Sequence, residues 1–445
     1  CMVSRLALWL TAFALWGGVP LQESDVWVKL REGEALAAAE QTEESQTEIF
    51  IHSETMVKEQ EGSEKEETRR EEERSGGGEE QARREEARVG GEEERFGREE
   101  ARAGGEEQTR KKIGDPEDGA GHGRSAQPKR VTLSFAGDIS FAEGYANMVS
   151  YHSRGNDIAQ CITPDLIARM DSADIMMVNN EFTYSNRGAP LSGKTFTFRA
   201  KPEMAENLLK LSVDIVSLAN NHVFDYGEIA LIDTLDTLDR YEIPYVGAGR
   251  NLEEAKKIVY MERGGMKIAF VSATQVERSY VFTKEATNSS AGVLRTFSPE
   301  TFLEVIRRAE ETSDFVVVYV HWGTEGVNQF EGDQQLLGHQ YIDAGADLVI
   351  GDHPHCLQGV EYYKGVPIFY SLGNYWFNSR TLDTGLVEAD ICQDGLLELR
   401  FVPCLQQNCR TSLVTDPAQQ QRVFRFLESI SANASVDELG VIREK

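Results

Sequence analysis

Short apolar runs that end in polar residues recur along the chain from Val131 onward. Five of them are compact and rich in apolar side chains: VTLSF from Val131, ADIMMV from Ala173, VDIVSLA from Val213, FVVVYV from Phe315 and ADLVI from Ala346. Nearly continuous apolar runs of this length are typical of strands that are buried on both faces. We therefore predict buried strands at these five positions.

Segments with helical spacing lie between the apolar runs. They are PEMAENLLKL (202–211), EIALIDTLDTLDRY (228–241), PETFLEVIRRAEE (299–311) and DQQLLGHQYIDAG (333–345). Two hairpin-like stretches are also present, KIVYMERGGMKIAFVSA (257–273) and GVEYYKGVPIFYSLGNY (359–375). This alternation predicts an α/β domain over residues 130–410, with a mixed sheet covered on both faces. Residues 411–445 are expected to form a C-terminal tail.

The residues that follow the apolar runs are rich in carboxylate, amide and imidazole groups. GD follows the first run, NNE the second, NNH the third, HWG the fourth and GDHPH the fifth. In open α/β sheets, ligands bind beyond the carboxyl ends of the strands. If the strands are largely parallel, one site contains the following side chains: Asp138, Asn179, Glu181, Asn221, His222, His321, His353 and His355.

Carboxylate oxygens and imidazole nitrogens are the usual ligands of Zn, Mn or Fe, so this set predicts a metal site. Each piece also has a plainer explanation. GD is a common turn, NNH can cap a helix, and Glu181 or His321 alone can be a satisfied polar side chain. The coincidence of five strand ends favours the metal site over these alternatives. His339, within a predicted helix, is assigned to packing or to the surface.

The N-terminal part of the chain has a different pattern. The apolar run Leu6–Trp16 is too short for an ordinary spanning helix, so residues 1–22 are predicted to be a signal sequence or a membrane anchor. Residues 23–129 are an acidic low-complexity linker, in which a fourteen-residue repeat begins at Arg70. The pattern argues against a coiled coil, because its a/d positions carry no apolar seam and glycines interrupt each copy. We predict a disordered region.

The formal net charge is −28, from 74 acidic and 46 basic residues. This charge argues against binding to nucleic acid or to anionic membrane through a basic surface. No CxxC pair is present, so a zinc ribbon has no support, whereas Cys404 and Cys409 are a candidate disulfide outside the cytoplasm. Together with the N-terminal segment, these features lead us to expect a protein on the extracellular face of the cell membrane or a secreted one.

The strand-end motifs resemble those of the CapA family, the poly-γ-glutamate capsule biosynthesis proteins, which share the calcineurin-like metallophosphoesterase fold. The matching pieces are FAGD at Phe135, NNE at Asn179, SLANNHVFDYG at Ser217, VHWGTE at Val320, AGADLVIGDHPHCLQGVE at Ala344 and YSLGNYWF at Tyr370. The resemblance spans Val131 to about Phe401. It implies a sandwich of mixed β-sheets flanked by helices, in which strand-end loops hold one or two divalent metal ions.

The resemblance also implies a role for each matching residue. The implied metal ligands are Asp138, Glu181, Asn221, His321, His353 and His355, with Glu181 between the ions. His222 is the implied acid beside the metal, and Asp225 would orient it through a hydrogen bond. Ser140 departs from the pattern, because metallophosphoesterases usually have Asp-x-His after the first strand. One metal therefore loses a nitrogen ligand.

Metal-assisted hydrolysis is the chemistry that such a site supports. Two cations lower the pKa of a bound water, so that hydroxide can attack a phosphoester or an amide or γ-glutamyl bond, and His222 can protonate the leaving group. We expect a capsule-biosynthesis hydrolase that acts on an anionic polymer or phosphoester, with polyglutamate synthetase subunits as partners. The alternative is a non-hydrolytic accessory subunit that binds polyglutamate during its synthesis or export.

Overall fold

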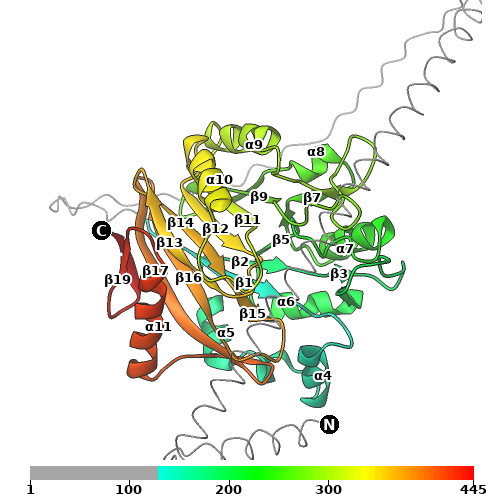
Figure 1. Cartoon of the computed structure of the whole chain (residues 1–445), viewed down its shortest axis with the longest axis horizontal. Helices are drawn as coiled ribbons and strands as arrows, with labels where there is room; N and C mark the ends of the chain where they lie inside the picture. The colour runs from blue at the N-terminus through cyan, green and yellow to red at the C-terminus, as the bar shows by residue number, and fades with distance from the viewer. Residues whose placement is uncertain (1–128) are drawn as a thin grey trace, which may run out of the picture. The chain divides into compact units, whose positions relative to one another are not determined.

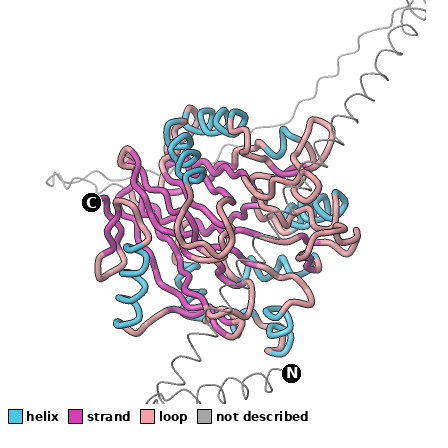
Figure 2. Tube along the Cα trace, viewed as in Figure 1, coloured by secondary structure: helices cyan, strands magenta, loops and turns pink. Residues whose placement is uncertain are grey.

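Residues 129–445 are described by a computed structural model of the chain. The predicted signal sequence or anchor (1–22) and the predicted disordered linker up to residue 128 lie outside the described residues. None of the helices within residues 129–445 contains an apolar stretch of the length that a membrane span requires. Most strands of this region form two large mixed sheets, and helices lie around them (Figures 1 and 2).

The first sheet is ten-stranded. Its order is β19 (Ala434–Val436), β20 (Val441–Glu444), β17 (Gly395–Gln407), β16 (Leu382–Cys392), β1 (Val131–Ile139), β2 (Ile175–Asn180), β5 (Ile215–Ser217) and β6 (Tyr245–Val246), with β15 (Asn374–Trp376) beside β1 and β18 (Arg410–Leu413) beside β17. Strands β1, β2, β5 and β6 are parallel to one another. Their carboxyl ends therefore lie at the same edge of the sheet.

The second sheet is six-stranded. Its order is β13 (Leu357–Tyr363), β14 (Val366–Leu372), β12 (Leu348–Asp352), β11 (Phe315–His321), β9 (Met266–Thr274) and β8 (Val259–Arg263). Strands β9, β11, β12 and β14 are parallel, whereas β8/β9 and β13/β14 are antiparallel pairs. The two hairpins predicted from the sequence are confirmed.

The single sheet predicted from the strand pattern is wrong, because the predicted strands divide between two sheets that pack face to face. On β11, Val317 and Tyr319 face the first sheet, whereas Val316 and Val318 face helices. Successive side chains of a strand point to opposite faces, so a strand between a sheet and a helix layer is apolar at every position. A strand between two helix layers has the same pattern. The sandwich implied by the family resemblance is the observed architecture.

Helices cover the outer face of each sheet. Those on the first sheet are α4 (Ala146–Ser153), α5 (Pro164–Asp171), α6 (Glu206–Lys210) and α7 (Glu228–Arg240), and those on the second are α8 (Leu252–Ala255), α9 (Glu300–Glu310) and α10 (Gly332–Asp343). Short elements complete the region: η1 (Ile158–Gln160), η2 (Pro202–Ala205), and the pairs β3 (Thr183–Tyr184) with β4 (Arg199–Ala200) and β7 (Ala248–Gly249) with β10 (Gly292–Val293).

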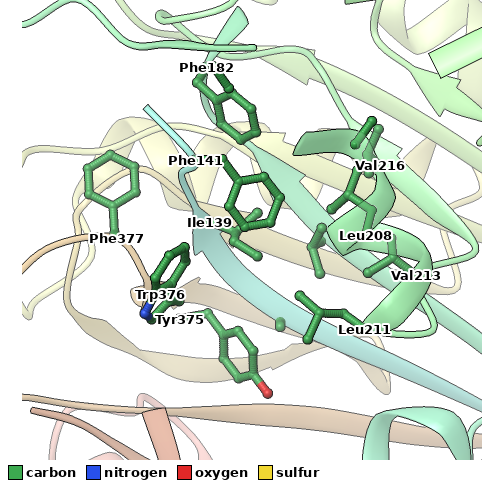
Figure 3. Packing of buried hydrophobic residues seen from close by; sticks show 14 of the residues in the cluster. Ile139, Phe141, Phe182, Leu208, Leu211, Val213, Val216, Tyr375, Trp376 and Phe377 are labelled. Carbon is green, nitrogen blue, oxygen red and sulfur yellow. The ribbon is translucent and has the colours of Figure 1, made fainter. Parts of the chain in front are cut away.

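An apolar layer fills the space between the first sheet and the helices on its outer face, next to the ends of the parallel strands. Figure 3 shows Ile139 and Phe141, at the end of β1, among side chains of α6 and of the segment that begins with β15. The Phe141 and Trp376 rings are 5.7 Å apart. Such fully buried aromatic rings contribute strongly to packing energy, so the end of β1 is held in a rigid surrounding.

Residues 411–445, expected to be a tail beyond the domain, are packed onto it. Helix α11 (Pro417–Ser429) contacts β13, and β19 and β20 add to the edge of the first sheet. The helix buries Val423, Phe424 and Leu427 in the interior shared by the two sheets. The i, i+4 spacing of Val423 and Leu427 gives the helix one apolar face, which explains why the segment packs.

The candidate disulfide between Cys404 and Cys409 is not formed. Both residues are buried free thiols, as are Cys161 and Cys392, and Cys356 is a half-buried free thiol. The fold of residues 129–445 therefore rests on packing and hydrogen bonds without a covalent cross-link.

Truncating the apolar face of α11 should destabilise the whole domain. We expect Leu427→Ala, at a fully buried position, to lower the free energy of unfolding by about 2–4 kcal/mol, because it leaves a cavity in the interior. The exposed Arg425 on the same helix provides the control, and Arg425→Ala should change this free energy by less than about 0.5 kcal/mol. Urea denaturation measures both. Equal effects of the two substitutions would show that α11 is not part of the cooperative unit.

Candidate metal centre

Side chains from the two sheets meet beyond the carboxyl ends of their parallel strands. Asn221 follows β5 of the first sheet, and its Oδ1 lies 2.9 Å from Nε2 of His321, the last residue of β11 in the second sheet. Asp138 in β1 lies 3.0 Å from His355, which follows β12 (Oδ2 to Nδ1). The structure thus brings together the residues that the sequence placed at separate strand ends.

Glu181 has the most unusual environment of the cluster. Its side chain is fully buried, and neither carboxylate oxygen accepts a hydrogen bond. Its Oε1 lies 3.4 Å from His321 Nε2, 3.9 Å from His222 Nε2 and 4.0 Å from His355 Nε2. Burial, and then the negative charge of Asp138, raise the pKa of Glu181 well above its usual value. A buried carboxylate that accepts no hydrogen bond destabilises the folded protein unless a proton or a cation compensates its charge.

Two histidines from the second sheet face Glu181. His353 Nδ1 lies 3.1 Å from His321 Nε2. Burial lowers the pKa of His321 to about 3 and the pKa of His353 well below its usual value, so both rings are neutral. A neutral imidazole has one nitrogen with a free lone pair, which is the form that binds metals.

The donor set fits a divalent cation. Glu181, His353 and His355 each offer one ligand atom, and these atoms all lie within 4.8 Å of one another. The Asn221 amide oxygen and His321 Nε2 lie against the same group. A carboxylate, an amide oxygen and imidazole nitrogens suit Zn²⁺, Mn²⁺ or Fe²⁺. All six predicted ligands are therefore in one cluster, and their binding of a metal stays a prediction.

The turn that carries His353 and His355 has an unusual backbone. His353 has φ 102° and His355 has φ 56°. Positive φ values are uncommon for residues other than glycine, and such conformations cost about 1–3 kcal/mol each. They persist where the surrounding structure enforces them, and they cluster at ligand sites. The conformation directs the two rings to opposite parts of the cluster, His353 to His321 and His355 to Asp138.

Asn374 is a site residue that the sequence analysis missed. It is buried at the start of β15, and its Oδ1 lies 2.8 Å from His355 Nδ1, while its Nδ2 has no hydrogen-bond partner. It is paired with Asp138 in the register of β1 and β15. The quoted motif YSLGNYWF contained the signal, but Asn374 does not end one of the five predicted strands.

The side of the cluster near Asp138 differs from the pattern expected of metallophosphoesterases. Ser140, which replaces the expected histidine, is buried, and its Oγ accepts a hydrogen bond from the Ala142 N–H (3.3 Å). It supplies no nitrogen. Burial raises the pKa of Asp138, but the hydrogen bond and charge of His355, with smaller effects of His321 and Asn179, together outweigh burial and keep the pKa below its usual value. On this side of the cluster, the atoms available as metal ligands are oxygens of Asp138 and Asn374 and a nitrogen of His355.

Two amides connect the halves of the cluster. Asn220 Nδ2 donates to Asn179 Oδ1 (3.0 Å), which fixes the orientation of the Asn179 amide. Asn179 Nδ2 then donates to Asp138 Oδ1 (2.8 Å) and lies 3.2 Å from His321 Nδ1. Asn179 therefore positions one side chain from each sheet.

His222 lies beside Glu181, and Asp225 fixes the orientation of its ring from the side away from the cluster. Its Nδ1 is 2.7 Å from Asp225 Oδ2, so Nε2 faces the cluster. Asp225 also accepts the Phe198 N–H (2.6 Å) and forms an ion pair with the buried Lys194 (Oδ1 to Nζ, 2.8 Å). Burial lowers the pKa of His222, although Asp225 acts in the opposite direction. The expected contact between His222 and Asp225 is present, and Lys194 is a partner that the sequence analysis missed.

Aromatic rings hold the two outer histidines of the cluster. The Phe198 ring centroid is 4.2 Å from that of His222, and the Phe377 centroid is 4.8 Å from that of His355. The two phenylalanines pack edge to face at 5.2 Å. This packing restricts the rotation of both imidazoles, because both phenylalanines are themselves buried.

The pH dependence of stability should identify Glu181 as an uncompensated carboxyl in metal-free protein. Above its ordinary value of 4.5, the native carboxyl keeps a proton that the unfolded carboxyl has lost. The contribution of Glu181 to the free energy of unfolding therefore falls as pH rises through this window. Glu181→Gln removes the effect. We expect the variant to gain stability relative to the wild-type protein as pH rises above the ordinary value of 4.5, measured by urea denaturation with a chelator. A constant difference would contradict this.

The chain is similar to one protein family and to several individual proteins. The model of the family described as "Bacterial capsule synthesis protein PGA_cap" matches residues 132–379. The Capsule biosynthesis protein CapA of Bacillus anthracis is 31% identical over 310 residues, which are 67% of this chain and 73% of that protein. The PGA biosynthesis protein CapA of Bacillus subtilis (strain 168) is 32% identical over 302 residues, which are 67% of this chain and 77% of that protein.

More distant similarities were also found. A probable polyglutamine synthesis accessory protein of Mycobacterium tuberculosis is 29% identical over 211 residues, 46% of this chain and 55% of that protein. Among solved structures, the calcineurin-like phosphoesterase YfkN from Bacillus subtilis is 14% identical with a TM-score of 0.35, covering 68% of this chain and 99% of that chain. A hypothetical protein from Thermus thermophilus has 16% identity and a TM-score of 0.39, covering 62% of this chain and 100% of that chain. Structural likeness at this level carries no argument about activity.

The family match covers the strand ends that form the cluster, from Asp138 to Asn374. The two CapA relatives extend the similarity over two thirds of the chain. The family resemblance seen in the strand-end motifs is thereby confirmed: the chain belongs to the family of bacterial capsule synthesis proteins that includes CapA.

Proposed function

We propose that this protein is a metal-dependent hydrolase of capsule biosynthesis, which cleaves a phosphoester or an amide or γ-glutamyl bond in an anionic substrate. The observation that carries the proposal is the environment of Glu181. A fully buried carboxylate without donors lies among neutral imidazoles and an amide oxygen. A carboxylate in this environment needs a proton or a cation to compensate its charge, and the nitrogen and oxygen atoms around it fit a cation.

The residues that would hold a cation fall into two groups. Glu181, Asn221, His321 and His353 form one group, and Asp138, Asn374 and His355 form the other, with Glu181 close to both. A divalent cation supplies Lewis-acid polarisation of the substrate and an acidic water when bound. Asn374 adds an oxygen donor on the side that lacks the expected histidine at Ser140, which supports a second, weaker ion there.

His222 is suited to move a proton. Its Nδ1 is held by Asp225, and its Nε2 faces the cluster, 3.9 Å from Glu181 Oε1. When Nε2 carries a proton, Asp225 stabilises the doubly protonated ring. The proton can then pass from Nε2 to the leaving oxygen or nitrogen as the bond breaks. Asp225, fixed by the Phe198 N–H and by Lys194, determines the direction of that N–H bond.

A non-hydrolytic accessory role is the second candidate. The Mycobacterium tuberculosis relative is named as a probable accessory protein of polyglutamine synthesis, and Ser140 removes one nitrogen from the expected ligand set. In this role, the same donors would hold a cation that binds a carboxylate polymer without cleaving it. Export or membrane attachment, expected from residues 1–22, is part of both proposals and rests on the sequence alone.

Metal content tests the ligand assignment directly. We expect the full chain to bind Mn²⁺ or Zn²⁺ in a ratio of roughly one or two to one, and His353→Ala combined with His355→Ala to abolish that binding, because both nitrogens are lost. Mass spectrometry of the metal in purified protein measures it. His339→Ala is the matched control, because His339 lies on α10 and contacts Glu361 outside the cluster. Equal metal content in the double variant and the control would refute the site.

Turnover separates the two candidate functions. We expect metal-loaded wild-type protein to hydrolyse an aryl phosphate mono- or diester or poly-γ-glutamate, and His222→Asn to lower kcat by about 10²–10⁴-fold with metal content unchanged, because the proton donor is lost. His339→Asn should keep wild-type turnover. Loss of less than about threefold in His222→Asn would remove His222 from the mechanism. Metal-dependent binding of the polymer without any turnover in the wild-type protein would establish the accessory role.

A further inference from the structure

A cavity of about 380 Å³ opens beside His355. Its lining comes from the three loops that follow β11, β12 and β15, from the first residues of β13 and β16, and from Phe426 of α11. The side chains that matter for its chemistry are Glu325, Asn328, His355, Arg380, Thr381 and Asp383. Because His355 belongs to the candidate metal centre, a molecule bound in this cavity would lie directly against that centre.

Arg380 is placed on a loop with a fixed backbone. Phe377 packs against His355 and precedes Arg380 by three residues. The Cα atoms of Phe377 and Arg380 are therefore at most about 11 Å apart. The buried Gln406 accepts the Phe377 N–H (2.9 Å) and donates to Arg380 O (3.2 Å). Asn378 Oδ1 accepts both the Arg380 N–H and Gln406 Nε2 at 3.0 Å. The position of the Arg380 main chain relative to His355 is therefore well defined.

The guanidinium group of Arg380 is free to bind a ligand. Among residues 129–445, it makes neither a hydrogen bond nor an ion pair, and Arg380 is exposed. Other arginines near the site are engaged: Arg422 makes two bonds to Asp383 (2.7 and 2.6 Å), and Arg199 lies 4.1 Å from the centre of the Tyr226 ring. Arg380 thus keeps five N–H donors in the planar arrangement that matches a carboxylate or phosphate.

The charges around the cavity also favour recognition by Arg380. Arg422 compensates Asp383, so this acid does not compete with a ligand for Arg380. Glu325, an exposed acid, forms no ion pair in the described part of the chain. One unpaired cation and one unpaired anion therefore remain on the cavity, and they should act on a charged ligand with opposite signs.

We propose that this cavity is the subsite for an anionic oxygen group of the substrate, a carboxylate or a phosphate, and that Arg380 is its specificity-determining residue. The identity of this ligand as substrate rests on the proposed function. The guanidinium binds the group through two parallel N–H···O bonds and holds the attached chain so that the next bond along it lies at His355. Glu325 opposes negative charge in its part of the cavity and so weakens the binding of uniformly anionic chains.

Equilibrium binding to the full chain tests the subsite. The probes are a fluorescein-labelled γ-linked glutamate oligomer and a labelled oligophosphate of similar charge, which distinguish the carboxylate from the phosphate source. We expect Arg380→Gln to weaken binding of one of them about tenfold, because a charge-assisted bidentate contact is lost. The affinity of Arg380→Lys for that probe should lie between those of the wild-type protein and Arg380→Gln. Glu325→Gln should tighten binding about threefold, because a repulsive charge is removed.

Arg307→Gln is the matched control, because Arg307 is exposed on α9 and does not line the cavity. It changes the net charge equally and should leave the affinity for both probes as in the wild-type protein. Equal affinities of Arg380→Gln and Arg307→Gln for both probes would overturn the proposal. The readout is binding, so a wild-type protein without turnover would contradict the hydrolase and leave this test intact. Both variants alter exposed side chains, and an unchanged thermal unfolding midpoint confirms that each is folded.

Discussion

The site of this protein depends on a buried carboxylate to which no hydrogen bond is donated. Glu181 leaves the first sheet directly after β2, and its oxygens face imidazole nitrogens from both sheets. Burying a charge costs several kcal/mol unless it is paired or hydrogen-bonded. In the metal-free protein, burial and the negative charge of Asp138 raise the pKa of Glu181, so that a bound proton avoids this cost. The same environment makes it a metal ligand, because a cation that displaces this proton meets a carboxylate that no hydrogen bond stabilises.

The sandwich architecture determines which residues can join Glu181. The first sheet supplies Asp138 and Asn221, and the second sheet supplies the three histidine ligands. Within the first sheet, β1 and β15 approach so closely that a Cβ at Gly137 would lie 1.8 Å from Gly373 O. Only glycine permits this approach, which lets the Asp138 N–H donate to Gly373 O at 3.0 Å and pairs Asp138 with Asn374.

Sequence patterns were sufficient for the parallel strands β1, β2, β5, β11 and β12, for the two hairpins and for the residues at the ends of the parallel strands. Asp138, Glu181 and His353 were found because each follows an apolar run, and a polar group there has few structural reasons to exist. Periodicity alone could not separate a sandwich from a single sheet, because a helix layer and a sheet layer demand the same apolar positions. The packing of α11 was missed because its apolar face is short and follows a polar stretch.

The site residues that were missed share one property. Asn374, Lys194 and Arg380 lie in segments whose position is set by contacts with distant parts of the chain, such as Gln406 beneath the Arg380 loop. No local pattern marks them, because an asparagine, a lysine or an arginine in a loop is ordinary. Their roles follow only from the neighbours that folding gives them.

The candidate metal ligands come from two different sheets, and this division has a mechanical consequence. Backbone hydrogen bonds hold the strands within each sheet, whereas the faces of the two sheets adhere mainly through apolar contacts such as those of Phe135, with few hydrogen bonds between them, such as that from Tyr319 OH to Ala136 O. An ion held by Glu181 and His353 would cross-link the layers at one edge by bonds that are directional and short. Its loss would leave that edge as the place where the layers can separate first, so that occupancy of the centre would govern how readily the domain opens to proteases.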